Sequence, residues 1–294
     1  MPRMIVDVHT HVFPPAFIAD RARLTADDPA FGALYADPRA RMASAAELLA
    51  AMDAAGVERA VAVGFAWRSP ERCAAHAADL LDAAAAAGGR LLPFVPVPTT
   101  FLLEPDRAPQ ARDWLAPLLA RGAVGLGEIR LGGGPSAPSL GQQEEAGSRL
   151  AALVAGHDLP LLVHASEDVG HAYPGKAGGF TPGGLWRLLD AHPVRVIAAH
   201  WGAGLPFSAL MPEVRSILEQ GRLVFDSAAS PLLYDAAVFE RAAALAGPEH
   251  VLWGSDFPLR EMAADRAAVE AALPDPALRA AVLGGNAARF LGLA

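Results

Sequence analysis

Two histidines separated by one residue, His9 and His11, lie near the end of an apolar run at residues 4–8. Alternate residues of a β-strand point to the same face, so their Cβ atoms lie roughly 6.5–7 Å apart and both imidazoles can bind one metal ion. Asp7 falls on that face too, where we expect it to orient the histidines rather than to bind. The alternative is a polar strand end with two exposed histidines.

Other polar residues lie at the ends of later apolar runs. Glu128 comes late in one run, and His164, His200 and Asp256 each end another. A histidine after an apolar strand is more often a hydrogen-bonded structural residue than a ligand. Burying several such groups together without partners would be costly, however, and a divalent cation would satisfy all of them.

The elements that position these residues are short apolar runs that alternate with Ala- and Leu-rich helical segments. Strands are predicted at 4–12, 59–66, 91–97, 123–131, 159–165, 194–201, 222–227 and 250–256. Their near-continuous hydrophobicity is typical of parallel strands covered by helices. Eight strand-helix units predict a single (β/α)8 barrel (TIM barrel) domain over residues 1–294, with the polar residues on the rim at the carboxyl ends of the strands. An open doubly wound sheet is the alternative, but no Gly-x-Gly-x-x-Gly motif follows the first strand.

The composition excludes several classes of function. The 294 residues are 53% hydrophobic and carry a formal net charge of −8, which argues against a nucleic-acid surface. Cys73 is the single cysteine, so no internal disulfide can form and a reducing compartment is favoured. We find no apolar stretch long enough to span a membrane and no basic start followed by a short apolar segment. We therefore expect a cytoplasmic protein with a small-molecule substrate and no nucleic-acid or membrane partner.

Five short motifs are distributed over nearly the full length of the chain: VDVHTH at 6–11, VH at 163–164, AHWG at 199–202, GSDFP at 254–258 and GGNAAR at 284–289. Together they resemble the amidohydrolase superfamily, in the branch of metal-dependent decarboxylases similar to aminocarboxymuconate semialdehyde decarboxylase. By this resemblance His9, His11, His164 and Asp256 are metal ligands. His200 matches a position that either helps to activate water or the reactant, or binds a second metal.

The chemistry of these ligands agrees with the resemblance. Neutral imidazoles and a carboxylate suit Zn²⁺, with Mn²⁺, Fe²⁺ or Co²⁺ as alternatives. A cation with an open position can lower the pKa of bound water to about 7. In the expected mechanism Asp256 accepts a proton from that water as it attacks a carbonyl carbon, while His200 and the metal stabilise the oxyanion. Asp256 or His200 then returns the proton to the leaving group.

Glu128 leaves the number of metal ions open. The resemblance implies two patterns, because binuclear members of the superfamily have a bridging residue at the end of strand four and the decarboxylase-like members use one metal without a bridge. Glu128 could be such a bridge. It could equally pair with Arg130 or accept a hydrogen bond from a metal-bound histidine, which favours one ion over two.

Candidate substrate-binding residues lie in loops at the same rim. The loop from Ser166 to Gly179 contains Tyr173 and Lys176, the only lysine, and is a candidate lid. Lys176 could bind a substrate carboxylate, or it could be an ordinary solvated charge. Arg130 and Trp201 could line the pocket, or they could serve barrel packing and rim salt bridges.

The remaining polar residues receive supporting or surface roles. Asp226 ends the seventh predicted strand and could accept a hydrogen bond from a ligand side chain. His76, His157, His192 and His250 fall away from the rim, and we expect them at the surface or at helix ends.

Three functions fit these residues. The leading one is metal-dependent hydrolysis of a small amide, ester or lactone substrate that carries a carboxylate group. The second is non-oxidative decarboxylation of a small unsaturated or aromatic acid, and the third is a metal-binding barrel without catalysis. A homodimer is expected only because homodimers are the commonest oligomers. Fold alone does not decide among these reactions, since one barrel hosts many of them.

Overall fold

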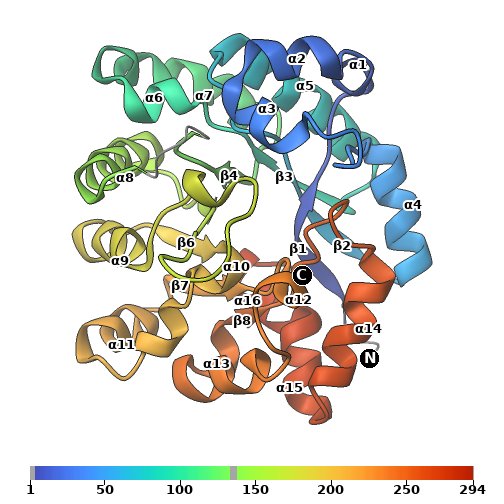
Figure 1. The fold of residues 1–294 in the computed structure, drawn as a ribbon, viewed down its shortest axis with the longest axis vertical. Helices are drawn as coiled ribbons and strands as arrows, with labels where there is room; N and C mark the ends of the chain where they lie inside the picture. The colour runs from blue at the N-terminus through green and yellow to red at the C-terminus, as the bar shows by residue number, and fades with distance from the viewer. Residues whose placement is uncertain (1–3, 133–137, 294) are drawn as a thin grey trace.

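The computed structural model describes residues 4–132 and 138–293, and its centre is an eight-stranded parallel sheet in the order β1 to β8. Val8 donates its backbone N–H to the carbonyl of Trp253, and Asp256 donates to the carbonyl of His9, so the segment around β8 closes onto β1. Helices surround the strands (Figure 1), which confirms the predicted (β/α)8 barrel. The strands are β1 (Val6–His11), β2 (Arg59–Val63), β3 (Leu91–Val95), β4 (Gly125–Ile129), β5 (Pro160–Val163), β6 (Arg195–Ala198), β7 (Leu223–Asp226) and β8 (Val251–Leu252).

The helices alternate with the strands, and several short ones lie in the loops. The α-helical segments are α1 (Pro15–Ala19), α2 (Arg21–Asp27), α3 (Pro29–Tyr35), α4 (Ala45–Ala55), α5 (Pro70–Ala86), α6 (Thr99–Leu103), α7 (Ala111–Ala120), α8 (Leu140–Val154), α9 (Pro182–Ala191), α10 (Ala199–Gly202), α11 (Pro212–Glu219), α12 (Ser230–Leu233), α13 (Val238–Ala246), α14 (Met262–Ala272), α15 (Pro276–Ala280) and α16 (Asn286–Leu291). Short 3-10 turns are η1 (Pro105–Gln110), η2 (Lys176–Gly178), η3 (Leu205–Ser208) and η4 (Pro248–His250), and η5 (Ala281–Gly285) is a π turn. Within the described ranges, no helix combines the length and apolar character needed to cross a bilayer.

The core has two layers. Inside the barrel, Val8, Val63 and Ile197 pack in a cluster that Phe290 of α16 also joins. A larger cluster fills the space between the outer faces of the strands and the surrounding helices. Because the barrel interior is filled by side chains below the rim, the polar strand ends remain at its open, carboxyl end.

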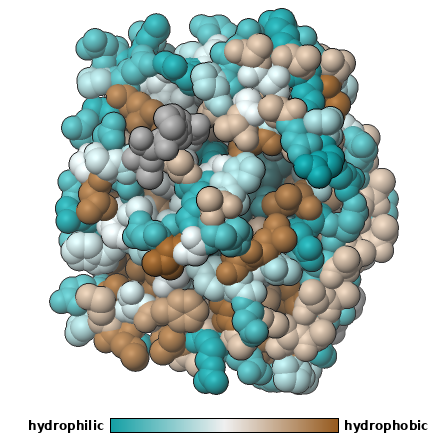
Figure 2. Space-filling model, in the orientation of Figure 1, coloured by the Kyte–Doolittle hydropathy of each residue, from teal (hydrophilic) through white to brown (hydrophobic). Residues whose placement is uncertain are grey.

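The strands end earlier than the apolar runs suggest. The eighth run extends to residue 256, but β8 stops at Leu252. The loops that follow the strands cover the rim, and the loop after β5 crosses in front of the barrel (Figure 1). Figure 2 shows the same face, on which hydrophobic side chains lie among hydrophilic ones.

Candidate metal centre

A register shift in β1 aims both of its histidines at the barrel interior. Asp7 pairs with Ala60 of β2 and Thr10 pairs with Ala62, so β1 contains one extra residue between these pairs. As a result Asp7 does not share the face of His9 and His11, and the expectation that it would is wrong. Instead Asp7 Oδ1 accepts hydrogen bonds from the backbone N–H groups of His9 at 3.1 Å and Ser255 at 3.0 Å, which fixes the backbone on either side of the site.

A similar register shift in β4 includes Glu128. The shift lies between Leu126 and Ile129. Gly127 has a φ of +156°, and a Cβ there would lie 2.8 Å from both Cβ and the carbonyl oxygen of Leu162. Only glycine therefore fits at the position that turns Glu128 toward the histidines.

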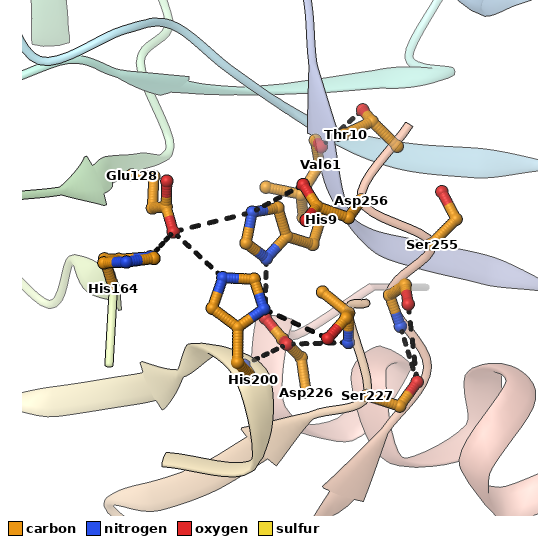
Figure 3. A network of polar contacts seen from close by, with 12 residues as sticks. His9, Thr10, Val61, Glu128, His164, His200, Asp226, Ser227, Ser255 and Asp256 are labelled. Carbon is orange, nitrogen blue, oxygen red and sulfur yellow. Dashed lines mark hydrogen bonds and ion pairs between the residues drawn. The ribbon is translucent and has the colours of Figure 1, made fainter. Parts of the chain in front are cut away.

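Glu128 contacts polar residues that come from several other strands (Figure 3). Its Oε1 is 2.7 Å from Nδ1 of His164, 3.5 Å from Nε2 of His200 and 3.8 Å from Nε2 of His9. Its Oε2 is 3.8 Å from Nε2 of His11. The structure thus brings together the polar strand ends singled out in the sequence.

Asp256 completes this group from the loop that follows β8. Its Oδ1 lies 3.3 Å from Nε2 of His11 and 3.7 Å from Nε2 of His9. We call these six residues the ligand cluster: His9, His11, Glu128, His164, His200 and Asp256. All six are buried except His11, whose side chain is 14% exposed.

His200 is presented by an unusual left-handed turn. His200 and Trp201 have φ values of 55° and 60°, and the segment labelled α10 is therefore not a right-handed helix. Such conformations are costly for residues with side chains and persist only where the surroundings enforce them. Asp226 Oδ1 accepts the backbone N–H of His200 at 2.9 Å, and the indole of Trp201 donates to Ser230 Oγ at 2.6 Å.

Charge compensation within the ligand cluster sets its protonation. Burial lowers the pKa of His9, but the carboxylates of Asp226, Asp256 and Glu128 outweigh it and raise that pKa to about 10. Burial likewise disfavours charge on His200, yet Glu128 and Asp256 raise its pKa to about 8. Without a cation, protons on these two imidazoles therefore balance the carboxylates at neutral pH.

The carboxylates of the cluster stay ionised. Burial raises the pKa of Glu128, but the neighbouring histidines, His164 first, hold it well below its usual range. Burial also raises the pKa of Asp256, and its contacts with His11 and His9 more than offset this and keep it below its usual range. Burial and the Arg130 guanidinium lower the pKa of His164 to about 4, so this imidazole is neutral.

The cluster fits a divalent cation. Two overlapping triads have ligand atoms within 4.8 Å of one another: His9, His11 and Glu128 form one, and Glu128, His164 and His200 form the other. His164 donates through Nδ1 to Glu128, which leaves the buried Nε2 as a lone pair without a hydrogen-bond partner in the described residues. Imidazole nitrogens and carboxylate oxygens are the donors that Zn²⁺, Mn²⁺ and Fe²⁺ bind.

A cavity of about 400 Å³ opens above the ligand cluster. The predicted residues Arg130 and Tyr173 line it together with members of the cluster. Sequence reasoning missed most of its wall, because these residues lie in loops without a recognisable motif. They are Leu34, Tyr35, Ala40, Arg41, Phe65, Ala229, Leu232, Leu233 and Leu259. His171 and Pro174, which also line the cavity, lie in the candidate lid loop at 166–179, and Pro258 belongs to the motif at 254–258.

Two residues predicted to bind substrate lie elsewhere. Lys176 does not line this cavity, and its Nζ donates to the carbonyls of Val169 at 2.6 Å and His171 at 3.0 Å. Trp201 is fully buried and packs edge-on against Phe239. Its side chain anchors the turn that presents His200 rather than contacting the cavity.

Two of the histidines that we expected at the surface or at helix ends are buried, although His250 does end η4. His76 is fully buried, with Nε2 facing the carbonyl of Val12 at 2.7 Å and Nδ1 accepting from the indole of Trp67 at 3.1 Å. His250 is 6% exposed and faces the carbonyl of Leu223. His76 satisfies both ring nitrogens with backbone or indole groups, and His250 pairs its Nδ1 with a backbone carbonyl of β7, contacts that a pattern in sequence does not reveal.

Comparisons with known proteins agree with this architecture. Residues 6–293 match the family model described as amidohydrolase. In a search of the curated proteins nothing matches the chain. Among solved structures, 5-carboxyvanillate decarboxylase from Sphingomonas paucimobilis is similar, with 17% identity over 99% of both chains and a TM-score of 0.70.

Two further solved structures are similar over nearly their full length. The 2,6-dihydroxybenzoate decarboxylase from Rhizobium shares 18% identity over 99% of both chains, with a TM-score of 0.68. The 5-carboxyvanillate decarboxylase from Novosphingobium aromaticivorans, in complex with manganese and a nitrobenzoic acid, shares 14% identity over 99% of this chain and 97% of that chain, with a TM-score of 0.74.

These neighbours correct one expectation from the sequence. Hydrolysis of an amide, ester or lactone was ranked first there because it prevails in the superfamily and because Glu128 is present. That ranking is wrong, since the three solved structures just described are decarboxylases, and they favour the alternative over the hydrolase.

Proposed function

We propose that this chain, which belongs to the amidohydrolase family, is a metal-dependent decarboxylase of a small aromatic or unsaturated carboxylic acid. One observation carries the proposal: the ligand cluster forms the floor of a cavity whose walls are largely apolar. Such a cavity suits a flat, conjugated ring whose carboxylate points toward the cluster. The decarboxylases of similar fold described above support the same reaction.

The walls of the cavity fit an aromatic acid. Leu34, Phe65 and Leu232 supply apolar surface for a ring. Arg130 supplies a cation beside the cluster, where its Nη1 lies 3.8 Å from Oε2 of Glu128. Arginine binds a carboxylate through paired N–H donors, and the protein interior makes that interaction stronger than it would be in water.

We propose that one divalent cation is held by His9, His11, His164 and Asp256. Glu128 then keeps the hydrogen bond that it accepts from His164. When bound, the cation would supply a positive charge that polarises oxygen atoms of the substrate. Mn²⁺ is the first ion to test beside Zn²⁺, because manganese is bound in the Novosphingobium decarboxylase and in a dihydroxybenzoic acid decarboxylase from Polaromonas.

His200 is the proposed proton donor. Its Nδ1 donates to the carbonyl of Ala228 at 3.0 Å, so its Nε2 faces the cluster and the cavity. In the metal-free cluster, Glu128 and Asp256 raise the pKa of His200 to about 8, which favours a proton on Nε2 near neutral pH. That proton passes to the substrate carbon that bears the carboxylate. The bond to the carboxylate then breaks, its electron pair returns to the ring, CO2 leaves, and water restores the proton on His200.

Product analysis tests this function. The purified protein, loaded separately with Mn²⁺ and Zn²⁺, is incubated with hydroxybenzoates and with a matched panel of lactones, esters and amides. We expect loss of CO2 from at least one acid and no hydrolysis. Asp256→Asn, which removes a charge from the cluster, should abolish the reaction. Hydrolysis of a panel member, with no acid decarboxylated, would overturn the proposal.

A further inference from the structure

Asp226, at the end of β7, contacts two members of the ligand cluster without belonging to it (Figure 3). Its Oδ2 lies 2.9 Å from Nδ1 of His9. Its Oδ1 accepts the backbone N–H groups of His200 at 2.9 Å and Ala228 at 3.0 Å. The side chain is fully buried, and each of its oxygens has a partner.

We infer that Asp226 is a positioning residue that prepares His9 to bind a cation and at the same time holds the backbone that presents His200. A carboxylate can only accept hydrogen bonds, so His9 must carry a proton on Nδ1. In a neutral His9 this leaves the lone pair on Nε2, which faces His11 at 3.1 Å and the rest of the cluster. Asp226 thereby selects the form of His9 that can bind metal through Nε2.

The second oxygen of Asp226 acts on the left-handed turn after β6. The bond from Oδ1 to the N–H of His200 holds the first residue of that turn, whose φ is 55°. The bond to Ala228 holds the backbone whose carbonyl accepts from Nδ1 of His200. The Asp226 carboxylate therefore holds both a proposed metal ligand on β1, His9, and the proposed proton donor after β6, His200. The ring centroids of these two histidines lie 5.3 Å apart.

An isosteric substitution separates these two roles. In Asp226→Asn the amide oxygen should occupy the Oδ1 position, because two backbone N–H groups point there and only one ring nitrogen faces Oδ2. The amide NH2 group then faces Nδ1 of His9 and must donate to it. His9 moves its proton to Nε2 and loses the lone pair that faces the cluster, while the turn at His200 keeps its hydrogen bonds.

This inference rests on the metal site of the proposed function but not on decarboxylation. Affinity for Mn²⁺ and Zn²⁺ is measured by calorimetry for the wild type, Asp226→Asn and Asp265→Asn. Asp265 is the matched control because it is a buried carboxylate that accepts from the indole of Trp253 and contacts no member of the cluster. We expect Asp226→Asn to weaken binding about 10–100-fold, with the control near wild type and the metal-free melting temperatures of all three similar.

A second readout does not depend on the variant folding. In the zinc-loaded wild type, ¹⁵N-edited NMR of the histidine rings should show a protonated Nδ1 and a metal-bound Nε2 on His9. Equal metal affinity in Asp226→Asn and wild type, or a His9 bound through Nδ1, would overturn the inference. If the wild type itself binds neither ion, the proposed function fails instead, so the two failures are distinguishable.

Discussion

Arg130 Nη1 lies 3.8 Å from Oε2 of Glu128, while its Nη2 donates to the carbonyl of Gly175 at 2.7 Å. Arg130 thus connects the ligand cluster to the loop that follows β5. The guanidinium is nearly buried, with 8% of its side chain exposed. Its position makes it the cation best placed to bind a substrate carboxylate beside the cluster.

Arg130→Met should raise the KM for an acidic substrate by about tenfold or more, because a charge-assisted hydrogen bond contributes roughly 1.5–3 kcal/mol. Steady-state kinetics with an acid that the panel experiment shows to be decarboxylated would measure it. The melting temperature serves as a check on the fold, since the bond to Gly175 is lost as well. An unchanged KM would show that Arg130 serves only to hold the loop.

Lys176→Met is the control for Arg130→Met, because it also removes a side chain that holds the loop after β5. Lys176 also donates to backbone carbonyls of the loop after β5, but it does not line the cavity above the cluster. We expect its KM for the same acid to stay within about twofold of wild type, since no direct contact with substrate is lost. An increase as large as that of Arg130→Met would restore Lys176 as a substrate-binding residue.

Gly127→Ala should displace Glu128 and weaken metal binding. The added Cβ would meet Leu162 at 2.8 Å in a fully packed interior, and such overpacking costs about 1–3 kcal/mol. Gly122→Ala is the control, because Gly122 has a φ of +100° but nothing within 4 Å of an added Cβ. Metal titration should show lower affinity for the first variant alone. Equal affinities would mean that the turn at Gly127 does not determine the position of Glu128.

His76 should make the fold less stable at mildly acidic pH. Burial lowers its pKa from 6.5 to about 4, so between these values the unfolded chain binds a proton that the folded chain excludes. Stability therefore falls as the pH drops through this window, by about 3 kcal/mol from this group. Urea unfolding of the wild type and of His76→Gln, across pH 4 to 7, checks the difference. Parallel pH profiles for the two proteins would contradict the assignment.

The barrel was predictable because its pattern is repeated eight times, and the histidines and Asp256 were found because each ends an apolar run. The details that aim them were not. The extra residue in β1 directs Asp7 and His9 to different faces of the strand. Its position is set by the pairing of β1 with β2 and cannot be read from the local sequence. Trp201 ends an apolar run, which left pocket lining and barrel packing as alternatives, and only the left-handed turn shows that its indole is directed to Ser230.

Most of the cavity wall also escaped prediction. Leu34, Tyr35 and Leu259 meet only after the loops fold over the rim, and loop residues follow no periodicity from which such contacts could be inferred. The extent of the domain, the homodimer and the cytoplasmic location remain predictions.

Release of labelled CO2 tests the central claim most directly. Hydroxybenzoates labelled with ¹³C in the carboxyl group are incubated with the metal-loaded protein, and the gas phase is analysed by mass spectrometry. We predict metal-dependent release of ¹³CO2 that stops when the protein is treated with a chelator and returns when Mn²⁺ or Zn²⁺ is added. Metal-loaded, folded protein that releases no ¹³CO2 from any of these acids, while it hydrolyses a lactone or ester, would contradict the account.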